Sequence, residues 1–173
     1  SAPAVAGTNT LTLPAETGEI LTTSNQSTNT PAFSVKLSAE QSLVEVTLTK
    51  IEFDTEEFDT DNAFDTSTYE FTVPTGKAGL YQFNFIVRVD AEEVTNLVYS
   101  HIYMYKNGSV HKRSYNYYSV NYIRANSHAG SVILDLAEGD YISLYVKHNT
   151  VDDTSGEINS GTYSNFSGHR LIT

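Results

Sequence analysis

The strongest constraint on the fold is the stretch of residues 79–89, in which apolar and polar side chains alternate. Successive side chains of a strand point to opposite sides, so alternate positions share a face. One face carries Tyr81, Phe83, Phe85, Val87 and Val89. The other carries Gln82, Asn84, Ile86 and Arg88. We therefore expect a strand that is fully covered on one side and half covered on the other, which favours a sandwich whose outer face meets a partner chain.

The composition favours an all-β domain. Tyr, Thr, Ser, Asn and Val are abundant, and 173 residues suffice for one domain with its own core. The chain contains no Cys, which excludes disulfides and thiolate metal sites. A net charge of −11 argues against a nucleic-acid partner. No apolar run reaches the roughly 18 residues that a membrane span needs, so we expect no membrane insertion.

The first 30 residues differ from the rest, because Thr, Asn, Ser and Ala dominate them. Such a segment cannot bury enough apolar surface to fold alone. We therefore expect residues 1–30 to be an extended stalk or linker and residues 31–173 to be a folded head. The sequence starts with neither Met nor a signal segment, so we expect Ser1 to follow further residues in a longer chain.

Residues 31–173 contain about nine or ten short strand-like stretches without a convincing helix, a pattern typical of a two-sheet jelly roll. Asn107-Gly108 predicts a tight hairpin turn, because both residues tolerate positive φ. Residues 44–53 alternate too, but the apolar phase changes near Thr49 and Lys50, which predicts a break or bulge in one strand.

Five short motifs occur in order along the head: Phe33-Ser34-Val35, Gly79-Leu80-Tyr81-Gln82-Phe83, Lys106-Asn107-Gly108, residues 134–144 and residues 164–168. Together they resemble the globular head of the complement C1q family, within the C1q/TNF superfamily, over roughly residues 31–173. The resemblance implies a ten-strand jelly roll that assembles as a homotrimer. It also implies that aromatic and apolar residues of 79–89 and of the last strand lie near the threefold contact.

Residues 7–18 look like the Thr/Leu/Pro/Gly stalk segments of bacteriophage tail and head fibres. Together, the two resemblances imply a viral fibre head on the virion surface, and hence an extracellular location. Its stalk would join other virion proteins, and its head would bind a host-surface glycan or protein. The alternative is a secreted C1q-like lectin or ligand-binding protein that no virion carries.

Two groups of acidic residues are candidate calcium sites. The first group lies within residues 52–65 and consists of Glu52, Asp54, Glu56, Glu57, Asp59, Asp61 and Asp65. It lacks the spacing of an EF-hand loop, so we interpret it as solvated charge. The second group follows from the resemblance, because several animal members hold calcium near the trimer axis in an equivalent loop. Here that loop contains Asp152, Asp153 and Glu157. We expect no other cofactor.

Tyr side chains are concentrated between residues 99 and 122, where they either pack the trimer interface or form a recognition surface. The candidate ligand-binding patch is Tyr115, Tyr117, Tyr118 and Tyr122 with Arg113 and Arg124. The five His residues show no metal-ligand or triad spacing, and no Ser lies in a Gly-x-Ser-x-Gly motif. We therefore expect a binding protein rather than an enzyme. A depolymerase that cleaves host polysaccharide is the enzymatic alternative.

Overall fold

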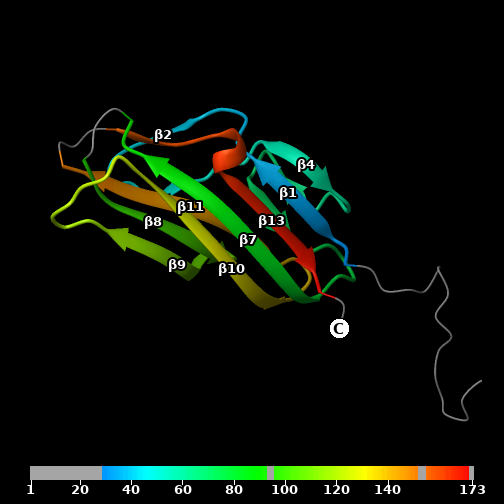
Figure 1. Ribbon diagram of the computed structural model, residues 1–173. Helices are drawn as coiled ribbons and strands as arrows, with labels where there is room; N and C mark the ends of the chain where they lie inside the picture. Colours follow the sequence, from blue (N-terminus) through cyan, green and yellow to red (C-terminus); the bar gives the residue numbers. More distant parts are fainter. Residues whose placement is uncertain (1–28, 93–95, 152–154, 172–173) are drawn as a thin grey trace, which may run out of the picture.

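The computed structural model describes residues 29–92, 96–151 and 155–171, and it shows two antiparallel sheets packed face to face (Figure 1). The first, the β7 sheet, has the order β2 (Gln41–Leu43), β12 (Gly156–Ile158), β7 (Gly79–Asp90), β13 (Asn165–Arg170), β1 (Ala32–Lys36) and β4 (Thr55–Asp59). Strand β10 (Ala125–Leu136) also pairs with β7.

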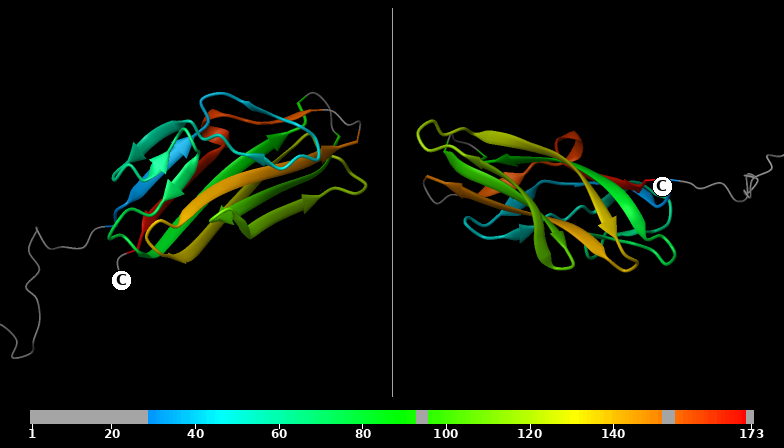
Figure 2. Two further views of the ribbon diagram at one scale, coloured as in Figure 1. Left: turned by 180° about the vertical axis from the view of Figure 1, so that it is seen from behind. Right: turned by 90° about the horizontal axis from the view of Figure 1, so that it is seen from below.

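The second, the β8 sheet, has the order β5 (Phe64–Asp65), β6 (Glu70–Thr72), β11 (Tyr141–Thr150), β8 (Leu97–Lys106) and β9 (Ser109–Tyr117), and β3 (Thr49–Lys50) also pairs with β11. Figure 2 shows the same two layers from behind and from below. The all-β jelly-roll prediction is confirmed. The described residues form thirteen strands, whereas ten were expected. Five of the thirteen are short and span only two or three residues. Their only helical element is the short 3-10 helix Gly161–Tyr163, so no helix there could span a membrane.

Strand β7 lies in the middle of its sheet, as its alternation predicts. All twelve of its residues pair with β10, and β13 pairs along its other edge. Tyr81, Phe83, Val87 and Val89 are buried, and Phe85 is half-buried. On the opposite side, Ile86 is 42% exposed. The strand therefore covers the core with one face and presents the other to the surroundings.

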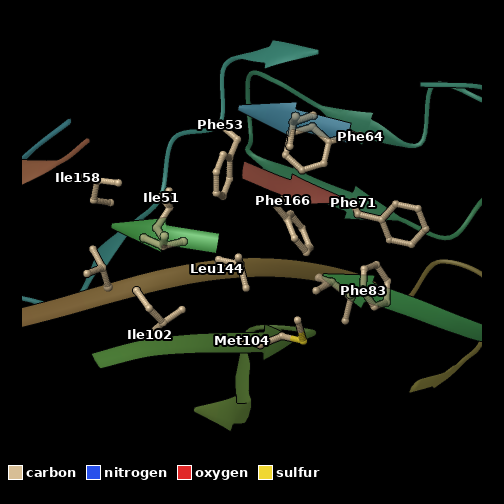
Figure 3. Packing of buried hydrophobic residues seen from close by; sticks show 14 of the residues in the cluster. Ile51, Phe53, Phe64, Phe71, Phe83, Ile102, Met104, Leu144, Ile158 and Phe166 are labelled. Carbon is tan, nitrogen blue, oxygen red and sulfur yellow. The ribbon is translucent and has the colours of Figure 1, made fainter. Parts of the chain in front are cut away.

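The core is a cluster of aromatic rings between the sheets (Figure 3). The ring of Phe33 stacks on that of Phe71 at 5.1 Å, and the rings of Phe83 and Phe166 lie 5.8 Å apart. Gly168 makes room for them, because a Cβ there would lie 2.6 Å from Phe83. We had expected these aromatic side chains near the threefold contact. The structure instead buries them inside the domain, because that face of β7 and β13 covers the β8 sheet.

Asn107 and Gly108 form the predicted hairpin turn between β8 and β9, with φ angles of 52° and 73°. The Asn107 side chain donates to the Asp140 carboxylate at 2.7 Å, and Lys106 contacts the same carboxylate at 2.8 Å. These two partners lower the pKa of Asp140 to about 2. One carboxylate thus connects the β8–β9 turn to the turn that precedes β11.

Residues 44–48 form a loop rather than part of a strand, and the break expected near Thr49 and Lys50 falls at the end of this loop. Val44, Val46 and Leu48 are exposed, and Val46 has a φ of 52°. The amide of Val46 donates to the carbonyl of His148 at 2.9 Å, which holds the loop against β11. Pairing resumes only at β3, after which Ile51 and Phe53 are buried. The change of phase marked the end of this loop.

The acidic stretch 52–65 faces water, as expected. Glu52, Asp54, Glu56, Glu57 and Asp65 are exposed, and Asp59 and Asp61 are half-buried. Several of the carboxylates close turns: Asp59 accepts from the amide of Phe64 at 2.7 Å. Asp65 accepts from the hydroxyl and the amide of Ser67, and these hydrogen bonds lower the pKa of Asp65.

Candidate ligand-binding face

Strand β8 places alternate side chains on opposite sides of its sheet. Ser100, Ile102 and Met104 point inward and are buried. Tyr99, His101, Tyr103 and Tyr105 point outward and are half-buried. The outer side of this strand is therefore aromatic along its whole length.

The neighbouring strands extend this aromatic surface through their register. Three rows run across β9, β8 and β11: Tyr117–Tyr99–Asn149, Tyr115–His101–Lys147 and Arg113–Tyr103–Tyr145. We call these nine residues the aromatic face. Five of the nine are Tyr, and none is acidic or aliphatic. The three strands lie next to one another on one side of the molecule (Figure 1).

The rings of the aromatic face contact one another and form one cluster. His101 lies between Tyr99 and Tyr115, with ring centroids at 4.4 and 4.2 Å. Tyr99 stacks on Tyr117 at 6.3 Å, and Tyr103 meets Tyr115 edge-on at 5.8 Å. Tyr115 and Tyr117 are 48% and 66% exposed, so the β9 side of the cluster is the most open to a ligand.

The electrostatics of the face are set by burial and by nearby cations, among them Lys50, whose Nζ lies 5.8 Å from the centre of the Tyr145 ring. The Arg113 guanidinium donates to the Tyr115 hydroxyl and lies 5.4 Å from the ring centre, and this hydrogen bond lowers the pKa of Tyr115. Burial raises the pKa of Tyr103 to about 12. Burial, and then Lys147, lower the pKa of His101, which favours its neutral form. The face therefore presents phenol hydroxyls beside fixed positive charge.

A groove of about 480 Å³ opens beside the aromatic face, between the edges of β9 and β10. Phe85, Ile102 and Met104 line its apolar part. Lys112 and Arg113 line its β9 side. Arg113 therefore stands at the boundary between the groove and the aromatic face.

The family follows from the sequence of the same domain. The C1q domain family matches residues 32–171, which is most of the chain. The chain belongs to the C1q domain family. Among proteins of curated function, none matches this sequence.

Solved structures of C1q and TNF-like proteins share the fold of this C1q domain. The globular domain of the zebrafish complement 1qA protein is 17% identical, with a TM-score of 0.54, and the match covers 82% of this chain and 98% of that one. Murine APRIL at pH 5.0 is 12% identical, with a TM-score of 0.57, and the match covers 81% of this chain and 98% of that one. At these identities the likeness establishes the fold alone.

The structure brings three of the six predicted ligand-binding residues together. Arg113, Tyr115 and Tyr117 lie on the aromatic face. Tyr118 instead packs against the core of this C1q domain, since adjacent side chains point to opposite sides. Arg124 pairs with the buried Asp90 at 3.1 Å, and Tyr122 is exposed in the segment that follows β9. Binding by these residues stays a prediction.

The patch predicted from the sequence included nothing from β11, which supplies Tyr145, Lys147 and Asn149 to the face. Their alternation with the buried Leu144, Val146 and His148 was a usable signal. That alternation shows which β11 residues point outward. It does not show that β11 lies next to β8, because this pairing joins segments far apart in the sequence.

The calcium prediction lies partly outside the described residues, because Asp152 and Asp153 are not among them. Glu157 lies on β12 and accepts from the Asn159 side chain at 2.8 Å. Burial, followed by the nearby carboxylates of Glu40, Glu92 and Asp90, raises the pKa of Glu157. Within the described residues, no group of three His, Asp or Glu side chains could hold a metal. Calcium at Asp152, Asp153 and Glu157 stays a prediction.

Proposed function

We propose that this C1q domain is a trimeric, non-enzymatic binding head that holds its ligand on the aromatic face. The observation that carries this proposal is the set of nine outward positions that combine five Tyr with Arg113, Lys147, His101 and Asn149. Tyr suits recognition because it offers a large apolar area and a polar tip at a small entropic cost. A sheet that needed only to face water would not require such a surface.

The outer side of the β7 sheet suits the contact between copies. C1q and TNF-like domains commonly form homotrimers that bind receptors. Outward positions along β7 and β10 are uncharged except Arg88 and Asp135, near opposite ends, and three of them are aliphatic and exposed: Leu80 by 36%, Ile86 by 42% and Ile133 by 57%. Depletion of charge is typical of the buried centre of an interface. Association through this side leaves the aromatic face open.

The alternative in which the Tyr side chains pack between copies is less favourable. It would bury Arg113 and Lys147, which form no ion pair with any described residue. Burying an unpaired charge costs several kcal/mol, as an order of magnitude. The contact between copies therefore fits the neutral side better than the aromatic one.

We further propose that the domain is the head of a fibre on a virion. Residues 1–30 have the composition of a stalk and precede the head directly, so they would join it to other virion proteins. The head would then lie at the extracellular surface of the virion and bind a host-surface glycan or protein. Residues 1–28 of the stalk lie outside the described residues, so the sequence is the support for this step.

Light scattering on the purified chain, with and without a calcium chelator, tests the assembly. We expect a mass of three times 19.1 kDa. A monomer under both conditions would overturn the proposal. A trimer that the chelator dissociates would assign calcium to Asp152, Asp153 and Glu157 as part of the assembly. A trimer that withstands the chelator would leave these acids as solvated charge.

A further inference from the structure

The aromatic face carries positive charge that no ion pair with a described carboxylate neutralises. The chain has 21 acidic and only 10 Lys or Arg residues, all ten of which the structure describes. Six of the ten lie within 4.0 Å of a described carboxylate. Two of the other four, Arg113 and Lys147, belong to the aromatic face, and Lys112 adjoins it. Although the chain has an excess of acid, these three cations form no ion pair with a described carboxylate.

The three strands under the face contain no Asp or Glu at all. Among the described residues, the carboxylate of Glu45 hydrogen-bonds to the face at its Asn149 end. It accepts from the Asn149 side chain at 2.6 Å and also from the amide and hydroxyl of Thr150. Hydrogen bonding to β11 therefore occupies Glu45, while Arg113 lies two rows away. Positive charge and exposed rings coincide only toward β9.

We propose that the ligand of the aromatic face is a carboxylated glycan, a polysaccharide that bears uronic or sialic acid residues. This inference rests on the proposed function, in which this face holds the ligand. Arg113 has a planar fork of donors that matches a carboxylate in a bidentate pair, and its cationic charge strengthens both hydrogen bonds. Beside it, Tyr115 and Tyr117 offer exposed rings to the apolar side of a sugar ring.

The shape of the surface fits a chain of sugars rather than a small isolated ligand. The face is the outer side of a sheet, with rows that cross three strands. Phenol hydroxyls and the Asn149 amide can exchange hydrogen bonds with sugar hydroxyls along its length. Lys147, in the middle row, provides a second positive charge for the next acidic sugar. A neutral glycan would use the rings and leave both cations unpaired.

Titration of the trimer with oligogalacturonate, hyaluronan oligosaccharide and sialyllactose tests this inference, each compared with its own methyl ester. The ester keeps the sugar rings and removes the charge. We expect at least one acidic form to bind, and its ester to bind about tenfold more weakly, as one lost charge-assisted pair predicts. Binding should also weaken as ionic strength rises.

Two matched pairs of variants locate the site. Arg113→Gln should weaken binding about tenfold, whereas Lys112→Gln, one residue away on the other side of β9, should have little effect. Tyr117→Ala should also weaken binding, whereas Tyr163→Ala, at an exposed Tyr outside the face, should not. Equal effects of the two charge variants would overturn the assignment to Arg113.

The remaining outcomes distinguish a failure of the carboxylate inference from a failure of the proposed function. A trimer that binds esters and acids equally, or binds only neutral glycans, overturns the carboxylate inference and keeps the binding head. A trimer that binds none of the three acidic glycans also overturns the inference. If dextran sulfate binds as tightly as the carboxylated glycans, the face binds anions in general and does not recognise carboxylates specifically. A monomer would instead remove the proposed function itself.

Discussion

The two outer sides of the sandwich are built on the same core and differ in almost everything else. Outward positions of β7 and β10 are small, amide-bearing or aliphatic apart from Arg88 and Asp135, with Ile86 and Ile133 the most exposed apolar ones. The nine outward residues of the aromatic face on β8, β9 and β11 are aromatic or cationic apart from Asn149. A strand period of two leaves the outer residues independent of the core. The difference indicates two separate tasks, contact between copies on one side and ligand binding on the other.

The largest expected effect comes from placing a charge on the neutral side. Ile86→Glu should abolish the trimer, because a carboxylate in the centre of the contact would be desolvated without a partner. Tyr117→Glu places the same charge on the aromatic face and should leave the trimer intact. Light scattering on both variants measures the masses. A trimer that tolerates Ile86→Glu and not Tyr117→Glu would reverse the roles of the two sides.

A core substitution should weaken both sides together. Gly168→Ala brings a Cβ to 2.6 Å from Phe83 and 2.8 Å from Phe33, both buried, so we expect a loss of about 3 kcal/mol in the free energy of unfolding. Gly130→Ala is the matched control. Its Cβ would meet Phe85, which is half-buried beside the groove and can move, so the loss should be smaller. Urea unfolding compares the two, and equal losses would contradict this account of the core.

A smaller, pH-dependent effect concerns the connection between the two sheets. His128 on β10 is buried, and its ring nitrogens contact the hydroxyls of Ser100 on β8 at 2.8 Å and of Ser114 on β9 at 3.0 Å. Burial is the largest cause that lowers its pKa, from 6.5 to about 4. As the pH falls below 6.5, His128 therefore binds a proton in the unfolded chain before it does so in the folded chain. The resulting stability is present above pH 6.5 and is lost as the pH falls toward 4.

We expect His128 to account for about 2 kcal/mol of this acid-induced loss. His128→Gln should remove that part of the pH dependence. Burial also lowers the pKa of His101 and His148, so the contribution of these two residues to the pH dependence will remain in the variant. Thermal unfolding across this pH range measures the difference between the two proteins. His111→Gln, at an exposed position, is the control. An unchanged pH profile in His128→Gln would show that this connection does not titrate.

Local patterns in the sequence were enough to predict the central part of the fold. The alternation of residues 79–89 and the Asn107-Gly108 turn depend on neighbouring residues, and both predictions are confirmed. The loop at residues 44–48 was missed, because the amide of Val46 and the carboxylate of Glu45 are held by residues about a hundred positions away. Apolar side chains alternate there without being buried. Only the tertiary contacts reveal that they form a loop.

The site was predictable only along one strand. Arg113, Tyr115 and Tyr117 share a face because they are two residues apart, and the same rule places Tyr118 on the other side. The contribution of Tyr145 and Lys147 depends on the β8–β11 register, which no local pattern fixes. The pairing of Arg124 with the buried Asp90 is likewise a contact between distant segments.

The first and last described strands are direct neighbours, and this affects how the molecule can be handled. Strands β1 and β13 pair in antiparallel register, and the amide of Arg170 donates to the carbonyl of Pro31 at 3.0 Å. The two described ends of the chain therefore meet at one pole of the domain (Figure 1). An affinity tag or a biosensor anchor joined directly to either described end would attach at that same pole. Immobilised heads would all point the same way, so a sensor surface could present the aromatic face uniformly without any change to it.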